Sequence, residues 1–500
     1  MAFCSPRRAS PSSLAAPLLL LILGTSVLAH GCVAAAGGAL FDLRRKIRLQ
    51  GAGGGVHHLA DLRKHDARRH LSGVDVPLGG NTVGDKAGLY FTELEIGTPG
   101  NAYHLEVDTG TGSTVVNCVD CLSCPSKNSL RMKLKLYNPN TSQSASTVLC
   151  GDIFCLDTNN GMPHGCIPTS PCPYSITSGD GRSTYGFFVK DLVKYNRVSG
   201  DGQTTPTSTA ITFGCGAKLA QDLGSPDQAL DGILGFGRSN SSMLSQLAAA
   251  GQARRIFAHC LDTANGGGIF AIGNIVQPKV KTTPLVPSMK NYNIKLKSID
   301  VDGTTLPIPP DTFSGEGKGT VIDSGRTLVY LPDMVYKTIT VAVFEKHPET
   351  LFHDFQDFLC FQYYGRIDDM FPKIVFHFEG DLLLNVYPHD YFLPNGSDWY
   401  CLGLRTGRSL QDMKDMVILG DLVLSNKLVV YDLEAQVLGW TDYDCSSSIK
   451  VEDDLTKSAY DVKAHRISSE ASIQSQFSVV ALFVFAVVLS PTGAYNQSFN

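Results

Sequence analysis

Two short motifs carry residue types that could activate a water molecule. Asp108 opens the sequence Asp-Thr-Gly-Thr, and Asp323 opens Asp-Ser-Gly-Arg 215 positions later (323 minus 108). Two carboxylates held close together cannot easily both ionise, so they share one proton. The ionised member can then take a proton from water while the other member donates one. We predict that Asp108 and Asp323 form such a catalytic pair, supported by Thr109, Gly110, Thr111, Ser324, Gly325 and Arg326.

The chain carries this pattern twice, which indicates a duplicated fold. An apolar run precedes each Asp, and each half later contains an apolar segment with glycine, at 231–235 and at 417–421. Glycine suits a strand that passes close to another backbone. Each later segment is therefore predicted to lie beside its catalytic turn. A single Asp of this kind would more often only cap a turn, but a matched pair favours catalysis.

Short segments of alternating hydrophobicity, separated by turn residues, predict an all-β fold. Few helices are expected. One is capped by Ser242 and ends near Gly251, and another opens at Pro332. The length of 500 residues predicts more than one folding unit, and the formal net charge of −5 gives no basis for nucleic-acid binding.

The N-terminal region has the pattern of a secreted protein. Arg7 and Arg8 precede an apolar run, which predicts a signal peptide over 1–29, with cleavage as late as 36. The basic segment 30–75 is interpreted either as a propeptide that covers an acidic cleft or as a solvated linker. We therefore predict entry into the secretory pathway and a location outside the cell, in the cell wall or at the outer face of the plasma membrane.

The body is predicted to divide into an N-terminal lobe, 76–283, and a C-terminal lobe, 284–445. A polar linker over 446–476 and an apolar tail over 477–500 are expected to follow. The apolar stretch 477–489 is shorter than the roughly 20 residues that a membrane-spanning helix needs. Small residues, a polar spacer and this stretch resemble a lipid-anchor attachment signal. Membrane attachment through a lipid and an untethered tail both stay open.

The cysteines favour disulfides over a metal centre. Of the fourteen in the sequence, Cys4 and Cys32 lie in or beside the predicted signal peptide, which leaves an even set. In a secreted chain this set predicts up to six disulfides. The run Cys118-x-x-Cys121-x-x-Cys124 could instead bind zinc or an iron–sulfur cluster. Because the secretory compartment is oxidising, we expect no metal site.

Together these residues resemble the pepsin-like aspartic endopeptidases, specifically the plant, cysteine-rich, nucellin-like branch, whose members are often lipid-anchored. The similarity runs from about 88 to 445 and is closest at 231–245, 257–279 and 420–450. The resemblance implies an all-β, bilobal fold with two six-stranded, barrel-like lobes and a central cleft between them. It implies that Asp108 and Asp323 face each other on the cleft floor. It further implies a monomer that hydrolyses polypeptides at acid pH without a cofactor.

The resemblance also implies covalent features. Cys360 and Cys401 match a disulfide typical of the second lobe, and Cys215 and Cys445 are candidates for a link between the halves. Separately, the pattern Asn-x-Ser/Thr predicts glycosylation at Asn140, Asn240 and Asn395.

One departure from the family lies in the second catalytic turn. The family places a small hydroxyl residue after each Asp-Thr/Ser-Gly; Thr111 conforms, whereas Arg326 does not. A guanidinium that contacts Asp323 would favour the ionised carboxylate and disturb proton sharing. An Arg326 side chain turned to solvent would only remove a hydrogen bond. Both interpretations stay open.

A second departure concerns the flap, predicted at Ser178, Gly179, Asp180 and Gly181. Ser178 stands where the family has a Tyr, and Val115 stands where the family has the Trp that contacts this Tyr. Losing both partners predicts a more mobile flap. Two functions therefore compete: an aspartic endopeptidase, or a binding or inhibitor protein on the same scaffold, as in plant xylanase inhibitors. Retention of both Asp residues favours the enzyme.

Overall fold

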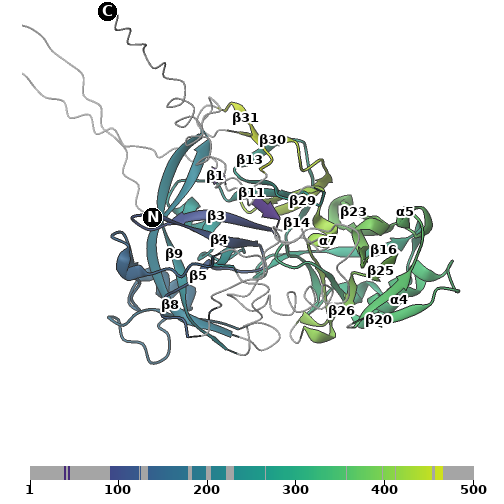
Figure 1. Cartoon of the computed structure of the whole chain (residues 1–500), viewed down its shortest axis with the longest axis horizontal. Coiled ribbons are helices and arrows are strands. Elements are labelled where there is room, and N and C mark those ends of the chain that lie inside the picture. The colour runs from purple at the N-terminus through teal and green to yellow at the C-terminus, as the bar shows by residue number, and fades with distance from the viewer. Residues whose placement is uncertain are drawn as a thin grey trace, which may run out of the picture. The chain divides into compact units, whose positions relative to one another are not determined.

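The structure is a computed structural model, shown in Figure 1. It describes residues 39–40, 43–45, 90–122, 124, 133–177, 183–198, 204–220, 230–264, 266–355, 357–396, 398–410, 413–452 and 457–465. All of them belong to one compact unit, residues 35–500. The predicted signal peptide, flap turn and apolar tail lie outside the described residues.

The first half of the chain consists mainly of strands. They are β1 (Ala39–Leu40), β2 (Leu43–Arg45), β3 (Tyr90–Ile96), β4 (Asn101–Asp108), β5 (Val115–Asn117), β6 (Ser146–Thr147), β7 (Pro173–Thr177), β8 (Ser183–Val198), β9 (Thr204–Ala220), β10 (Gly232–Gly235), β11 (Ile256–Leu261), β12 (Gly268–Ile272), β13 (Asn274–Gln277) and β14 (Lys281–Pro284).

The second half repeats this character. Its strands are β15 (Tyr292–Ile294), β16 (Leu296–Val301), β17 (Thr304–Thr305), β18 (Gly319–Ile322), β19 (Val329–Leu331), β20 (Phe352–Phe355), β21 (Phe358–Gln362), β22 (Ile374–Phe378), β23 (Leu383–Val386), β24 (Phe392–Pro394), β25 (Trp399–Leu402), β26 (Leu404–Thr406), β27 (Met416–Leu419), β28 (Lys427–Asp432), β29 (Val437–Asp442), β30 (Ser448–Glu452) and β31 (Ala459–Lys463).

Helices are short and few, as predicted. They are α2 (Ile153–Thr158), α3 (Met243–Ala249), α4 (Asp333–Phe344), α5 (Ile367–Met370), α6 (Pro388–Tyr391) and α7 (Asp421–Leu424), with 3-10 turns η1 (Pro139–Thr141), η3 (Pro310–Phe313), η4 (Glu379–Asp381) and η5 (Gly407–Ser409). Ser242 caps α3, because its hydroxyl accepts from the backbone N–H of Ser245 at 3.2 Å. Pro332 precedes α4 at its N-cap. No helix within the described ranges is long and apolar enough to cross a membrane.

The strands form one large sheet and several smaller ones. The large sheet has fifteen strands in the order β14-β29-β28-β11-β12-β1-β8-β9-β5-β10-β4-β3-β2, with β6 and β7 paired to β8. The second half adds the sheets β15-β18-β27-β19-β26, β17-β16-β22-β23 and β20-β21-β25-β24. The predicted all-β, two-lobed fold is confirmed. The strands do not form two separate six-stranded barrels. β28 of the second half pairs with β11 of the first, so strands of both halves belong to one sheet.

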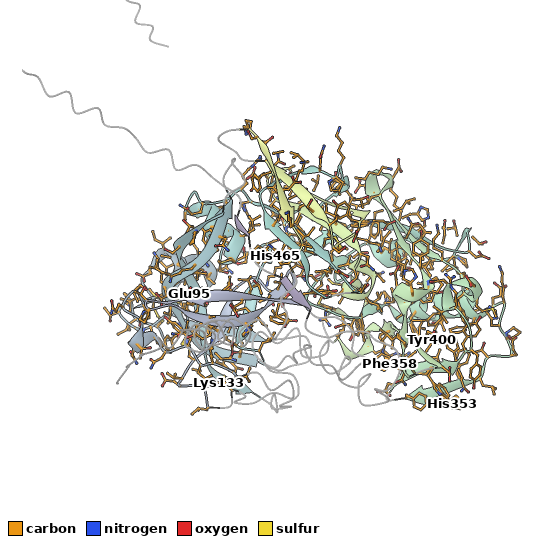
Figure 2. All side chains as sticks on the ribbon, turned by 45° about the horizontal axis from the view of Figure 1, so that its top comes forward. Glu95, Lys133, His353, Phe358, Tyr400 and His465 are labelled. Carbon is orange, nitrogen blue, oxygen red and sulfur yellow. A yellow bond between two sulfur atoms is a disulfide. The ribbon has the colours of Figure 1, made fainter. Side chains whose placement is uncertain are left out.

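Residues after Cys445 fold back onto the first half, which corrects the predicted linker. β30 and β31 pair with each other, and β30 pairs with β13 (Figure 1). Ile449 and Val462 are buried in one apolar cluster with Cys445. His465, labelled in Figure 2, exchanges two backbone hydrogen bonds with Gly268. The prediction of a linker over 446–476 is therefore wrong for β30 and β31. Their alternate residues are apolar and are buried in this cluster.

Part of the predicted propeptide also lies in the large sheet. β1 lies between β12 and β8, and β2 pairs with the outer edge of β3. A fully solvated linker, one of the two interpretations of 30–75, is therefore wrong for these residues. Strand pairing uses backbone groups that nearly every residue type carries. The basic composition of 30–75 therefore gave no sign that β1 and β2 would join the sheet.

Six disulfides account for the twelve cysteines. The predicted Cys360–Cys401 bond is present. The predicted link between Cys215 and Cys445 is wrong, because Cys215 bonds Cys118 and Cys445 bonds Cys260. Strand neighbours decide this: β9 runs beside β5, and the segment after β29 packs against β11. The remaining bonds are Cys121–Cys124, Cys150–Cys166 and Cys155–Cys172.

Candidate active site

The first predicted turn follows β4 and is positioned by β10. β10 pairs in parallel with β4, placing Gly235 opposite Asp108, and antiparallel with β5. A Cβ on Gly235 would lie 2.4 Å from the backbone of Ser113. Only glycine allows the two backbones to approach this closely, so the predicted role of this segment is confirmed.

The second predicted turn has the same construction. β27 pairs in parallel with β18, placing Leu419 opposite Ile322, and antiparallel with β19. A Cβ on Gly420 would lie 2.5 Å from the carbonyl oxygen of Arg326. The two halves thus use one strand arrangement to hold one Asp each.

Asp108 is buried and held by three donors. Its Oδ1 accepts from the backbone N–H of Gly110 at 2.7 Å and of Thr111 at 3.0 Å. Its Oδ2 accepts from the Thr111 hydroxyl at 2.7 Å. The side chain is 2% exposed, so these bonds fix the direction of the carboxylate.

Asp323 is held differently. Its Oδ1 accepts from the backbone N–H of Gly325 at 3.0 Å, and its Oδ2 lies 3.4 Å from Nε of Arg326. The Arg326 side chain is fully buried, and its guanidinium lies 5.3 Å from the centre of the Tyr330 ring. The structure therefore agrees with the interpretation in which Arg326 contacts the Asp323 carboxylate, and not with the one in which its side chain turns to solvent.

The two turns meet directly. The backbone N–H of Ser324 donates to Thr109 Oγ1 at 2.9 Å, and the Ser324 hydroxyl donates to the carbonyl oxygen of Val107 at 3.4 Å. A Cβ on Gly110 would lie 2.8 Å from both carboxylate oxygens of Asp323. Because the N–H of Gly110 donates to Asp108, the two carboxylates lie on either side of this glycine. The structure thus brings together the predicted pair and its six supporting residues.

Other predicted site residues lie elsewhere. Val115, in β5, is fully buried in an apolar cluster with Phe188, so it fills core space in place of a Trp. Ser178, Gly179, Asp180 and Gly181 lie outside the described residues.

The three glycosylation predictions differ in accessibility. Asn140 and Asn240 are exposed. Asn395 is 7% exposed, which contradicts its prediction in the folded chain, because an attached glycan needs surface. The tripeptide pattern carries no information on burial.

No metal centre is found in the part of the chain that the structure describes, where no group of three or more His, Cys, Asp or Glu side chains converges. Cys118, Cys121 and Cys124 are all in disulfides. The arrangement at the two Asp residues instead supplies paired acids without a metal.

Two buried residues behind the first turn had no signal in the sequence. Tyr431, in β28, is fully buried, and burial raises the pKa of its hydroxyl well above 10. His259, in β11, lies with Nε2 3.0 Å from the Tyr431 hydroxyl, and burial lowers its pKa to about 3. Both belong to ordinary apolar strand patterns, so only the tertiary structure reveals that they contact each other.

A third group, the partly buried His104, lies on β4 four residues before Asp108. Its ring nitrogens lie 3.0 Å from Glu93 Oε2 and 3.5 Å from Asp231 Oδ2. Burial opposes its charge, but the hydrogen bonds to Asp231 and Glu93 outweigh burial and raise the pKa of His104.

The comparisons with known proteins agree with this geometry. Residues 90–274 match the family model described as xylanase inhibitor N-terminal, and residues 291–442 match xylanase inhibitor C-terminal. The chain is 44% identical to Aspartic proteinase 36 of Arabidopsis thaliana over 429 residues, which cover 85% of this chain and 88% of that protein. It is 42% identical to Aspartic proteinase 39 of the same plant over 416 residues, 82% of this chain and 86% of that protein.

Among solved structures, the fold is similar to that of basic 7S globulin from soybean. The TM-score is 0.54 at 20% identity, covering 74% of this chain and 96% of that chain. At this identity the likeness concerns the fold alone. The chain belongs to the pepsin-like aspartic proteinase family, as its extended identity to the Arabidopsis proteins shows.

Proposed function

We propose that the chain is an aspartic endopeptidase in which Asp108 and Asp323 activate a water molecule at acid pH. The observation that carries this proposal is the contact between the turns, in which Gly110 lies against the Asp323 carboxylate while its N–H holds Asp108. A water molecule bound between such carboxylates can attack the carbonyl carbon of a peptide bond. No cofactor is required for this step.

The charges at the site influence how the proton is divided. The positive charge of Arg326 favours an ionised Asp323. The three donors to Asp108 favour its ionised form in the same way, so neither Asp is singled out as the base. The member that is ionised takes the proton from water, and the other member donates to the carbonyl oxygen. The resulting diol then breaks its C–N bond: the Asp that took the proton from water passes it to the leaving nitrogen, and the other Asp takes back a proton from a diol hydroxyl as the carbonyl reforms.

The test is proteolysis of denatured globin by the secreted chain at acid pH, with and without the inhibitor pepstatin. Asp108→Asn removes the acid while keeping the shape of the side chain, and we expect it to abolish cleavage. Asp120→Asn is the matched control, since Asp120 is an exposed carboxylate just after β5. Equal cleavage by wild type and Asp108→Asn would refute the proposal.

One observation favours a second candidate, a binding or inhibitor protein. Arg326 occupies a position where it neutralises one catalytic carboxylate, and the matching family models carry the description xylanase inhibitor. On this alternative the chain binds a glycoside hydrolase and cleaves nothing. Inhibition of a xylanase by a preparation that leaves globin intact would favour it.

We also propose that residues 30–75 act as an inhibitory pro-segment of a secreted, externally located protein. The pairing of β2 with β3 and the six disulfides support this proposal. Purifying the secreted chain and sequencing its N-terminus before and after acid treatment tests it. Release of a fragment ending near residue 75, together with a rise in activity, is the expected outcome.

A further inference from the structure

Asp231, the residue directly before β10, binds three other segments of the first half. Its N–H donates to the carbonyl oxygen of His104 in β4 at 3.0 Å, and its carbonyl oxygen accepts from the N–H of Asn117 in β5 at 2.9 Å. Its carboxylate Oδ2 accepts from the N–H of His104 at 2.9 Å, and Oδ1 accepts from the N–H of Lys135 at 2.7 Å. Asp231 is 1% exposed. A single buried residue therefore joins β4, β5 and the segment 133–137 at the start of β10.

β10 is a short strand whose own side chains specify its register weakly. Its sequence is Gly-Ile-Leu-Gly, and the glycine at each end has no side chain to pack. The space around it nevertheless demands one register. A Cβ on Gly232 would lie 2.1 Å from the carbonyl oxygen of Val115, and a Cβ on Gly235 would lie 2.4 Å from the backbone of Ser113. A slip of one residue would bring a side chain into each of these contacts, and the hydrogen bonds of Asp231 oppose such a slip.

β10 leads from Asp231 directly to the first catalytic turn. In its parallel pairing with β4, Gly235 lies opposite Asp108. Just beyond the strand, the N–H of Phe236 donates to the carbonyl oxygen of Asp108 at 2.8 Å. His104, to which Asp231 is bonded, stands four positions before Asp108 on the same strand (108 minus 104). The two strands that position Asp108 are thus fixed to each other at their far end by Asp231.

The second half carries different residues at the corresponding places. β27 pairs with β18 as β10 pairs with β4, and Gly319 lies opposite Met416. Gly319 precedes Asp323 by four positions (323 minus 319), as His104 precedes Asp108 (108 minus 104). Glycine has no side chain, and the thioether of methionine is only a weak acceptor. The carboxylate bonds of the first half therefore have no counterpart at this pair, although the strands around it are duplicated.

Only a carboxylate can make both side-chain bonds of Asp231. Each of its two oxygens accepts from a different backbone N–H. An amide has one oxygen and one NH₂ group, so the NH₂ of an asparagine would face a donor and not an acceptor. Asp231→Asn therefore keeps the size of the side chain and breaks one of the two bonds.

The ring of His104 contributes charge, whereas its backbone contributes register. Glu93 lies opposite His104 in the pair β3–β4, whose strands lie side by side in Figure 1. The His104 ring nitrogens lie 3.0 Å from Glu93 Oε2 and 3.5 Å from Asp231 Oδ2. The two bonds that align β4 with Asp231 use only the N–H and the carbonyl oxygen of His104. Loss of the ring should therefore leave the strand in place.

We propose that Asp231 is a positioning residue of the catalytic site. It fixes the register of β10 against β4 and thereby holds Gly235 beside Asp108, which determines where the first carboxylate stands relative to Asp323. The inference rests on the proposed peptidase function for its effect on turnover. Its structural consequence, slow exchange of the His104 and Lys135 amides, does not depend on turnover.

The experiment compares variants of two buried carboxylates in the secreted full chain. Asp191→Asn is the matched control for Asp231→Asn, because Asp191 in β8 is also 1% exposed. Its carboxylate accepts from two hydroxyls at 2.6 Å and from one N–H at 2.7 Å, none of them on β4 or β10. Hydrogen–deuterium exchange is measured first. We expect Asp231→Asn to give several-fold faster exchange of the peptide containing His104, of the one containing Lys135, or of both, and Asp191→Asn to leave the His104 peptide unchanged.

Peptide cleavage is measured second. We expect kcat to fall about tenfold in Asp231→Asn with KM unchanged, because displacement of a catalytic group costs rate rather than substrate binding. Asp191→Asn should keep the wild-type kcat. His104→Gln should also keep it, since the backbone bonds to Asp231 persist.

The pH profile of kcat/KM is the third measurement. Two carboxylates that share a proton titrate with two apparent pKa values, and the separation of these values decreases as the carboxylates move apart. The two catalytic turns are in contact, so a relaxed register separates them. The limits of the profile should therefore lie closer together in Asp231→Asn and should stay in place in Asp191→Asn.

A milder variant covers the case in which Asp231→Asn is not secreted. Lys135 Nζ donates to the carbonyl oxygen of Ala102 in β4 at 2.6 Å, which holds the segment 133–137 against this strand. Lys135→Met removes this bond from a partly exposed side chain and weakens the contact with Asp231. We expect faster exchange at the same two peptides and a fall in kcat of about two- to threefold.

The outcomes separate the two proposals. If wild type cleaves nothing, the peptidase proposal fails, while exchange at His104 and Lys135 still decides whether Asp231 holds the strands. The inference is overturned if Asp231→Asn leaves both peptides as protected as in wild type, or lowers kcat no more than Asp191→Asn does. Faster exchange spread evenly over all peptides would also overturn it, since that indicates general destabilisation. If only Lys135→Met is secreted, unchanged exchange at both peptides overturns it in the same way.

Discussion

The turns that carry Asp108 and Asp323 have the same arrangement of strands around them, but they differ in how each carboxylate is held. In the first turn, the neutral hydroxyl of Thr111 donates to Asp108 at 2.7 Å. In the second turn, the cation Arg326 lies 3.4 Å from Asp323 and is buried. A neutral donor orients a carboxylate and leaves the net charge of the site unchanged, whereas a buried cation changes that charge. The duplicated strands therefore set the geometry, and single side chains set the electrostatics.

The largest effect expected is the loss of either acid. Asp323→Asn should lower kcat about 10³-fold or more, as Asp108→Asn should, because both members of the pair act in one step. Cleavage of a short fluorogenic peptide at the wild-type optimum measures the two variants side by side. Substantial activity in Asp323→Asn alone would show that the turn carrying Arg326 has left the catalytic machinery.

The next effect concerns the contact between the turns. Gly110→Ala places a Cβ only 2.8 Å from the Asp323 carboxylate oxygens, so one turn must move, and we expect kcat to fall roughly 10- to 100-fold. Gly216→Ala in β9 is the control, because a Cβ there would meet its nearest atom at an ordinary distance of 3.5 Å. Equal activity of these two variants would contradict the close approach of the turns.

A smaller effect should follow from exchanging the holding groups. Arg326→Thr removes a positive charge that favours ionisation of the pair, so the pH window with one shared proton should move upward by about one unit. Thr111→Val removes only a neutral donor from Asp108 and should move the window upward by less. The profile of kcat/KM against pH measures both. If the Arg326→Thr profile superimposes on that of wild type, the cation does not influence the pair.

The smallest effect concerns the histidines behind the first turn, which carry opposite pKa shifts. The pKa of His259 is lowered to about 3, so the unfolded chain binds more protons between pH 3 and 6.5, and the free energy of unfolding should fall as pH drops through this range. The pKa of His104 is raised by Asp231 and Glu93 against the effect of burial. Its contribution is fully present below pH 6.5 and is lost as pH rises through the folded value.

Urea unfolding at several pH values tests this contrast. His259→Gln should lose less stability than wild type on acidification from pH 6.5 to 4, by an amount on the order of 1 kcal/mol or more. His104→Gln should lack the gain in stability that wild type shows as pH falls through the folded pKa of His104 toward 6.5, because it lacks a stabilising proton-binding group. Parallel stability curves for all three proteins would contradict both pKa shifts.

Much of the site could be predicted from the sequence because its signals are local. Asp108 ends a strand, Asp323 directly follows one, and glycines at 235 and 420 mark close backbone contacts. The sequence signals for these features come from neighbouring residues alone. The Cys360–Cys401 bond was predicted correctly from the family pattern. The pairing of Cys445 was not, because the strands beside a cysteine are set by the whole sheet.

The sequence by itself determined the fold class, the duplication and the identity of the paired acids, since residue type and short-range pattern specify each of these. Only the tertiary structure decided the direction of Arg326, the burial of Asn395, the β30–β31 hairpin and the contact between His259 and Tyr431. The physical reason is that burial and hydrogen bonding depend on which surfaces meet in space. Residues such as His259 and Tyr431, 172 positions apart, carry no local pattern that relates them.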